Sequence, residues 1–99
     1  MKGYLAEILE DMLSEAKRKS TSKRKLKNGL AVSIKVLQQE VSITLGRETA
    51  RPSLNEWETV MKNFPYNTPK VMPTPVDQNG WLCITAKVPS STIMQMKFG

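Results

Sequence analysis

The spacing of apolar residues changes along this chain between the period of a helix and the period of a strand, and this change limits the fold most. In residues 4–16 apolar positions recur every three or four residues, which places them on one face of a helix. In residues 30–36, 41–45 and 82–88 they alternate with polar residues, as in half-buried strands. Both periods within 99 residues predict one α+β domain over residues 1–99.

A second helix is predicted from its end signals. Residues 53–56 read Ser-Leu-Asn-Glu, the S-x-x-E capping box in which the serine and glutamate side chains bond each other's backbone N–H groups. Pro52 stands directly before the box, and an apolar stripe follows it as far as Phe64. Pro65 then ends the helical pattern. We therefore expect a helix that begins after Ser53.

Turn signals order the strands into hairpins. Asn-Gly pairs at 28–29 and 79–80 favour tight turns because both residue types tolerate positive φ. The short gap between 30–36 and 41–45 predicts an antiparallel pair, and residues 71–76 are predicted to pair with the last strand. Two prolines in 71–76 are tolerable only at a sheet edge. The expected fold class is α+β, with a small antiparallel sheet of three to five strands and two helices packed on one face.

The cysteine count and the hydropathy bound the setting of the protein. Cys83 is the single cysteine, which excludes an intramolecular disulfide and favours a reducing compartment. No run of about 18 apolar residues occurs, so no membrane span is expected. These features predict a cytoplasmic protein, with a nuclear location as the alternative in a nucleated cell.

Positive charge is concentrated in one short segment. Residues 17–27 hold seven of the 15 lysines and arginines and no acid, although the formal net charge of the whole chain is only +6. No apolar residue lies between Ala16 and Leu26, so the segment has nothing to bury. We expect residues 17–28 to form a basic linker or loop between the first helix and the first strand.

The sequence lacks the residues on which common catalytic sites depend. It contains no histidine, which removes the usual general base and both serine and cysteine triads. With one cysteine and no histidine there is no ligand set for structural zinc. Neither of the glycine-rich phosphate-binding motifs G-x-x-x-x-G-K-[ST] and G-x-G-x-x-G occurs. We therefore expect no enzymatic activity, no cofactor and no metal.

The basic segment makes nucleic-acid binding through phosphates, without base specificity, the leading functional interpretation. Five to seven phosphate contacts would give a log–log salt slope of about −5 to −6 on duplex DNA. The segment carries no aromatic residue, so stacking on bases would come from Trp81 or Tyr66. The expected nucleic-acid-binding residues are Lys17, Arg18, Lys19, Lys23, Arg24, Lys25, Lys27, Arg47 and Arg51.

Other interpretations stay open at the level of sequence. The basic run is also typical of a solvated loop, of a segment that binds acidic lipid or an acidic protein, or of a nuclear-targeting signal. The main alternative function is a protein-interaction or self-associating, homodimeric module. Its expected interface residues are Trp81, Cys83, Met94, Met96 and Phe98. The nucleic-acid interpretation requires that Glu7, Asp11 and Glu15 do not already neutralise the basic residues.

Overall fold

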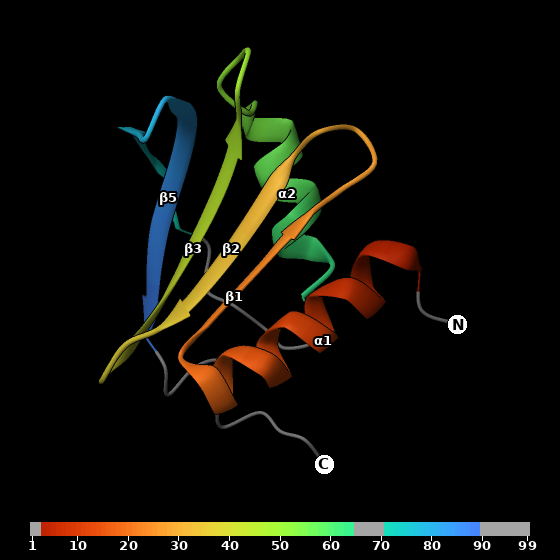
Figure 1. The fold of residues 1–99 in the computed structure, drawn as a ribbon, viewed down its shortest axis with the longest axis vertical. Helices are drawn as coiled ribbons and strands as arrows, with labels where there is room; N and C mark the ends of the chain where they lie inside the picture. The colour runs from red at the N-terminus through yellow and green to blue at the C-terminus, as the bar shows by residue number, and fades with distance from the viewer. Residues whose placement is uncertain (1–2, 65–70, 90–99) are drawn as a thin grey trace.

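The computed structural model describes residues 3–64 and 71–89 and places them in one domain of two helices and five strands. The helices are α1 (Tyr4–Lys19) and α2 (Leu54–Lys62). The strands are β1 (Thr21–Lys25), β2 (Ala31–Val36), β3 (Glu40–Arg47), β4 (Thr74–Gln78) and β5 (Trp81–Pro89). Figure 1 shows the strands side by side, with α1 running along the β1 side of the sheet.

All five strands belong to one antiparallel sheet in the order β1-β2-β3-β5-β4. Side chains alternate between the two faces of a strand, so the register assigns each residue to a face. One row across the sheet joins Arg24, Val32, Leu45 and Ile84, and we call the face it belongs to the inner face. The next row begins at Lys25 and belongs to the opposite, outer face.

The hydrophobic core lies on the inner face. Leu9, Met12 and Ala16 of α1 are fully buried, and so are inner-face residues such as Ile34 and Ile43. Trp57 and Val60 of α2 join the same cluster of buried residues. The apolar residues that recur every three or four positions in α1, and those that alternate in β2 and β3, are thus buried as their patterns predict.

The segment expected to be a basic linker or loop is instead structured, which corrects that prediction. Residues 17–19 form the last turn of α1, and Ser20 ends the helix in the left-handed region at φ 72°. Thr21–Lys25 then form β1, an edge strand paired with β2 from Thr21↔Lys35 to Lys25↔Ala31. The strand forms without apolar side chains because its backbone groups pair with β2.

The expected sheet of three to five strands with two helices packed on one face is wrong as a description of this fold. The structure has a five-stranded antiparallel sheet, a long N-terminal helix and a short second helix, and it is roughly α+β overall. The longer helix, α1, lies against β1 and β2, whereas α2 buries only Trp57 and Val60 of its nine residues.

Both Asn-Gly turns form as expected. Gly29 has φ +86° in the β1–β2 connection, and Asn79 and Gly80 have φ 49° and 81° between β4 and β5. β4, with Pro75 inside it, is the other edge of the sheet, the position predicted for a proline-containing strand. No helix in the described ranges is both long enough and apolar enough to cross a membrane.

Candidate nucleic-acid interface

Folding separates the predicted basic residues into those paired with carboxylates and those left facing water. Glu15 of α1 lies between Lys19 and Arg24, at 3.9 Å from the Lys19 Nζ and 3.1 Å from an Arg24 Nη1. Arg24 belongs to the inner face of β1, which directs it toward α1. Part of the cationic run is therefore neutralised by its own chain.

A third contact completes the Glu15 cluster. Ser22 is the buried polar residue of β1, and its hydroxyl donates to the same Glu15 oxygen at 2.6 Å. This hydrogen bond, followed by the one from Arg24, lowers the pKa of Glu15 below its ordinary value. Glu15 thus joins the end of α1 to the edge strand. Glu7 and Asp11, the other acids considered, are exposed on α1.

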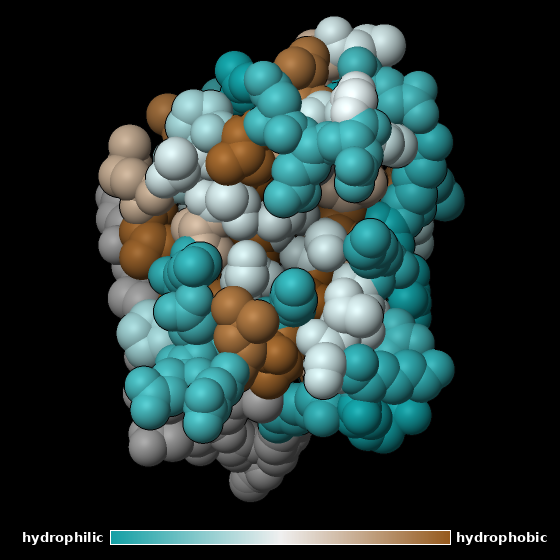
Figure 2. Space-filling model, turned by 60° about the vertical axis from the view of Figure 1, so that its left-hand side comes forward, coloured by the Kyte–Doolittle hydropathy of each residue, from teal (hydrophilic) through white to brown (hydrophobic). Residues whose placement is uncertain are grey.

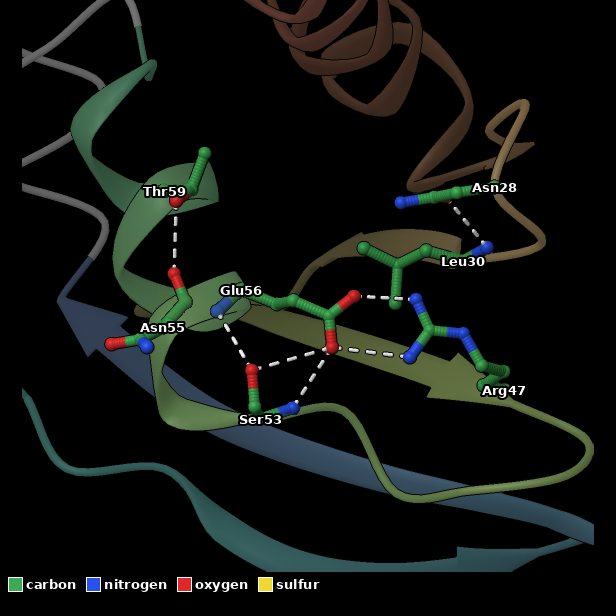
Figure 3. A network of polar contacts seen from close by, with 7 residues as sticks. All are labelled: Asn28, Leu30, Arg47, Ser53, Asn55, Glu56 and Thr59. Carbon is green, nitrogen blue, oxygen red and sulfur yellow. Dashed lines mark hydrogen bonds and ion pairs between the residues drawn. The ribbon is translucent and has the colours of Figure 1, made fainter.

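Arg47 has a structural role at the start of α2 (Figure 3). Its guanidinium contacts both carboxylate oxygens of Glu56, with the Nη1–Oε1 bond at 3.1 Å. The same carboxylate accepts the Ser53 backbone N–H at 3.0 Å, and the Ser53 hydroxyl accepts the Glu56 N–H, which completes the predicted capping box. The Arg47 contact comes first among the causes that lower the pKa of Glu56 to about 2.

Two more predicted residues contact their own chain. The Arg51 Nη2 lies 2.7 Å from an Asp77 carboxylate oxygen, in an exposed ion pair between the loop before α2 and β4. The Lys27 Nζ lies 5.1 Å from the centre of the Tyr4 ring at the start of α1. Exposed contacts of this kind contribute little to stability, so both cations stay available to a stronger anion.

Three other basic residues of the segment, Arg18, Lys23 and Lys25, face water. Arg18 is exposed, whereas Lys17 is half-buried. Lys23 and Lys25 of β1 are exposed and belong to the outer face, since they alternate with the inward Ser22 and Arg24. Lys23 makes no ion pair with any residue in the described part of the chain.

The register adds two lysines that the sequence-based site did not include. Lys35 stands opposite Thr21 on β2, as a diagonal neighbour of Lys23, and such neighbours are about 7–8 Å apart. Lys87 of β5 shares this face but pairs with Glu40 at 3.3 Å. The outer face thus holds four lysines against one glutamate among the described residues. The sequence held a signal for Lys35, because the alternation of residues 30–36 already placed this lysine on the polar side of the strand.

Hydroxyl groups surround these lysines. The row that begins at Lys23 continues through Ser33, Thr44, Thr85 and Thr74 across all five strands. Thr44 and Thr85 hydroxyls are 2.7 Å apart, and Thr85 donates to the Ile43 carbonyl at 3.1 Å. Figure 2 turns the β5 side of the molecule forward and shows mostly teal and pale side chains interrupted by small brown patches. The outer face is therefore a polar, cationic surface.

Trp81 is the aromatic residue of this face. It is half-buried at the start of β5, and the exposed Lys25 places its Nζ 5.8 Å from the ring centre. The row of the sheet that begins at Lys25 continues through Ala31, Gly46 and Cys83. These three residues have small side chains or none. A Cβ atom on Gly46 would come within 3.7 Å of a Trp81 ring carbon, so the ring lies close to the backbone of β3.

Cys83, a predicted interface residue, is buried beside Gly46 on the same face of the sheet. Its side chain is 5% exposed, and a Cβ on Gly46 would lie 2.8 Å from its sulfur. Burial, followed by the nearby Asp77 charge, raises the pKa of its thiol. Cys83 thus packs as a small apolar residue. Met94, Met96 and Phe98, and the second aromatic candidate Tyr66, lie outside the described residues.

A separate apolar groove of about 630 Å³ lies between α2 and the segment before β4. Its lining includes Leu54 and Met61 of α2 together with Met72. Leu54 is 54% exposed and Met72 is 77% exposed, high values for large apolar side chains. The groove contains none of the outer-face lysines.

The described residues contain no group of three or more histidine, cysteine, aspartate or glutamate side chains placed to hold a metal ion. Comparison of the chain with protein-family models, with curated proteins and with solved structures found no match. The geometry of the outer face is therefore the basis for a functional proposal.

Proposed function

We propose that this protein is a non-enzymatic nucleic-acid-binding module that holds phosphates on the outer face of its sheet, without base specificity. One observation carries the proposal: Lys23, Lys25 and Lys35 stand together on this face, and none of them has a carboxylate partner among the described residues. A cluster of unneutralised lysines attracts a phosphate chain and releases its counterions.

The residues proposed to contact phosphates are not simply the consecutive basic residues of the segment 17–27. Lys19 and Arg24 share Glu15, and Arg47 is bound to Glu56, so these three contribute less to an external phosphate. Lys35 joins instead, because the β1–β2 hairpin brings it beside β1. About three phosphate contacts predict a log–log salt slope of about −3 on duplex DNA, shallower than the linear run suggested.

Each proposed contact has a simple test. We expect Lys25→Gln to weaken binding to generic DNA and RNA at low salt, and the triple change of Lys23, Lys25 and Lys35 to glutamine to remove most of it. Lys62→Gln is the matched control, since Lys62 is exposed on α2, an element with no outer-face residue. Absence of binding at low salt, or equal weakening by Lys62→Gln and Lys25→Gln, would refute the proposal.

The setting follows from the same proposal. A cytoplasmic location, or a nuclear one in a nucleated cell, suits a nucleic-acid partner, and the lone Cys83 favours a reducing compartment. No catalytic step is part of the proposal, because the chain has no histidine and carries none of the phosphate-binding glycine motifs.

A second candidate function, self-association, has its own observation. The groove beside α2 presents Leu54 and Met72 to water, and exposed apolar patches mark interaction sites. A second copy of this chain covering the groove would give a mass that rises with concentration in light scattering. Met72→Lys should then return the mass to that of a monomer. A constant monomer mass in the wild-type protein would exclude this candidate.

A further inference from the structure

We propose that the outer face binds single-stranded nucleic acid in preference to duplex, with an unpaired base stacked on Trp81 and the neighbouring phosphates held by Lys25 and Lys23. This inference rests on the proposed function and names its ligand class. It joins two elements that are far apart in the chain: the aromatic ring at the start of β5 and the cationic edge strand β1.

The first step concerns access to the ring. The Lys25 side chain is exposed, and its ammonium group lies over the Trp81 ring at 5.8 Å from the centre. Trp81 itself is only half-buried, so part of its ring reaches water, on a side that the exposed Lys25 also reaches. A base stacks on an aromatic face, and Lys25 can turn from the ring to the phosphate beside that base.

The second step concerns the surface beneath the ring. Ala31 and Gly46 stand next to Lys25 in one row of the register, and neither has a side chain larger than a methyl group. The Trp81 ring therefore lies close to the sheet, at 3.7 Å from the position of a Gly46 Cβ. A base stacked on it would remain near the adjoining row of serine and threonine hydroxyls, which can bond phosphate or sugar oxygens.

The third step separates single strands from duplex. Unpaired bases offer their faces for stacking, whereas bases in a duplex are already stacked on one another. Sequence reading in a duplex uses an element that enters a groove, commonly a helix or a β-ribbon. The outer face consists of strand residues of one sheet, and no helix of the described residues lies over it (Figure 1). The major groove admits a helix or a two-stranded ribbon, and a five-stranded face is wider than such a ribbon. A duplex should therefore contact this face mainly through its phosphates.

The stacking contribution sets the expected effect. Base–aromatic stacking stabilises single-strand complexes enough that Trp81→Leu should weaken binding about tenfold or more. Trp81→Phe retains a ring and should keep most of the affinity. Ser14→Ala is the control, because it changes an exposed side chain of α1, away from both the outer face and the groove beside α2. Neither Trp81 variant should change binding to duplex by more than about twofold, since phosphate contacts dominate there.

The experiment uses the full chain and three probes of about 15 nucleotides, within the site size of single-strand-binding modules: oligo-dT, oligo-U and a mixed-sequence duplex. Fluorescence anisotropy at low and near-physiological salt gives the affinities. Tryptophan emission of the wild-type protein gives a second readout that needs no variant. Trp57 is only 3% exposed, so quenching by a single strand reports Trp81.

Tighter binding of either single strand than of duplex, with quenching of the emission, supports the inference. The relative affinity of oligo-dT and oligo-U then identifies DNA or RNA. Equal affinity for single strands and duplex, with no quenching, overturns the inference. If that binding still falls with salt and in the Lys25→Gln variant, the phosphate-binding proposal survives. Absence of binding to all three probes at low salt overturns both.

Discussion

Replacement of Glu56 by glutamine should remove a defined part of the folding free energy. The Glu56 carboxylate holds the Arg47 guanidinium through both oxygens and accepts the Ser53 N–H, so it joins the end of β3 to the first turn of α2. Glutamine keeps the length and one acceptor oxygen of glutamate but has no charge. The change therefore removes the ion pair while it leaves the packing nearly unaltered.

The magnitude follows from the pKa of the carboxyl group. The contacts lower the pKa of Glu56 from 4.5 to about 2, which at about 1.4 kcal/mol per pH unit sets a ceiling of about 3 kcal/mol. The Glu56 side chain is 28% exposed, and water screens part of this interaction. We expect Glu56→Gln to lower the free energy of unfolding at neutral pH by about 1–2 kcal/mol.

The sign of the pH dependence is fixed by the direction of the shift. A carboxyl group with a lowered pKa in the folded protein stabilises it fully above the pKa of the unfolded chain, and this stabilisation is lost as pH falls through the folded value. For Glu56 the window runs from near pH 5 down to about 2. In this window the wild-type protein should lose stability faster than the Glu56→Gln variant.

Urea unfolding followed by circular dichroism, repeated from neutral pH to about pH 2, measures both effects. Glu58→Gln is the matched control, because Glu58 is an exposed acid on the same helix without an ion pair to any described residue. The reasoning is refuted if both variants lose the same small amount at neutral pH. It is equally refuted if the gap between wild type and Glu56→Gln stays constant down to pH 2.

Three further changes test other parts of the structure. Ser53→Ala should lower the free energy of unfolding by about 1 kcal/mol, measured by thermal melting, because the Glu56 N–H loses its acceptor. Gly29→Ala should cost about 1 kcal/mol in urea unfolding, because φ is +86° there, and an unchanged midpoint would contradict the turn assignment. Glu15→Gln should release Arg24 and strengthen binding to DNA at low salt, an increase that disappears at high salt; weaker binding would show that the Glu15 pair instead holds β1 in place.

The sequence predicted the elements that have a strong local signal. Alternating residues identified β2, β3 and β5, and the Ser53 capping box identified the start of α2. It failed at β1, where no apolar residue alternates and the strand depends on backbone pairing with β2 and on the hydrogen bond from Ser22 to Glu15. Such partners are distant in the sequence, so no local pattern reveals them.

The candidate site was only partly predicted, because its geometry also depends on strand pairing between residues distant in the sequence. Lys23 and Lys25 were identified by charge density, but their separation from Arg24 follows from the two faces of a strand that was not expected. Trp81 was identified as an aromatic candidate, while its position beside Lys25 depends on a register that spans four strands. Lys35 was missed because one lysine in an alternating strand looks like an ordinary polar position.

The two edges of the sheet resist aggregation in different ways. Open edge strands can recruit further strands and seed fibrils, and both lysine side chains and proline discourage this. At β1 the protection is electrostatic, through Lys23 and Lys25, whereas at β4 Pro75 lacks the N–H that a new strand would need. Salt weakens the first protection and leaves the second unchanged. In concentrated, high-salt solutions the chain should therefore begin to polymerise from β1.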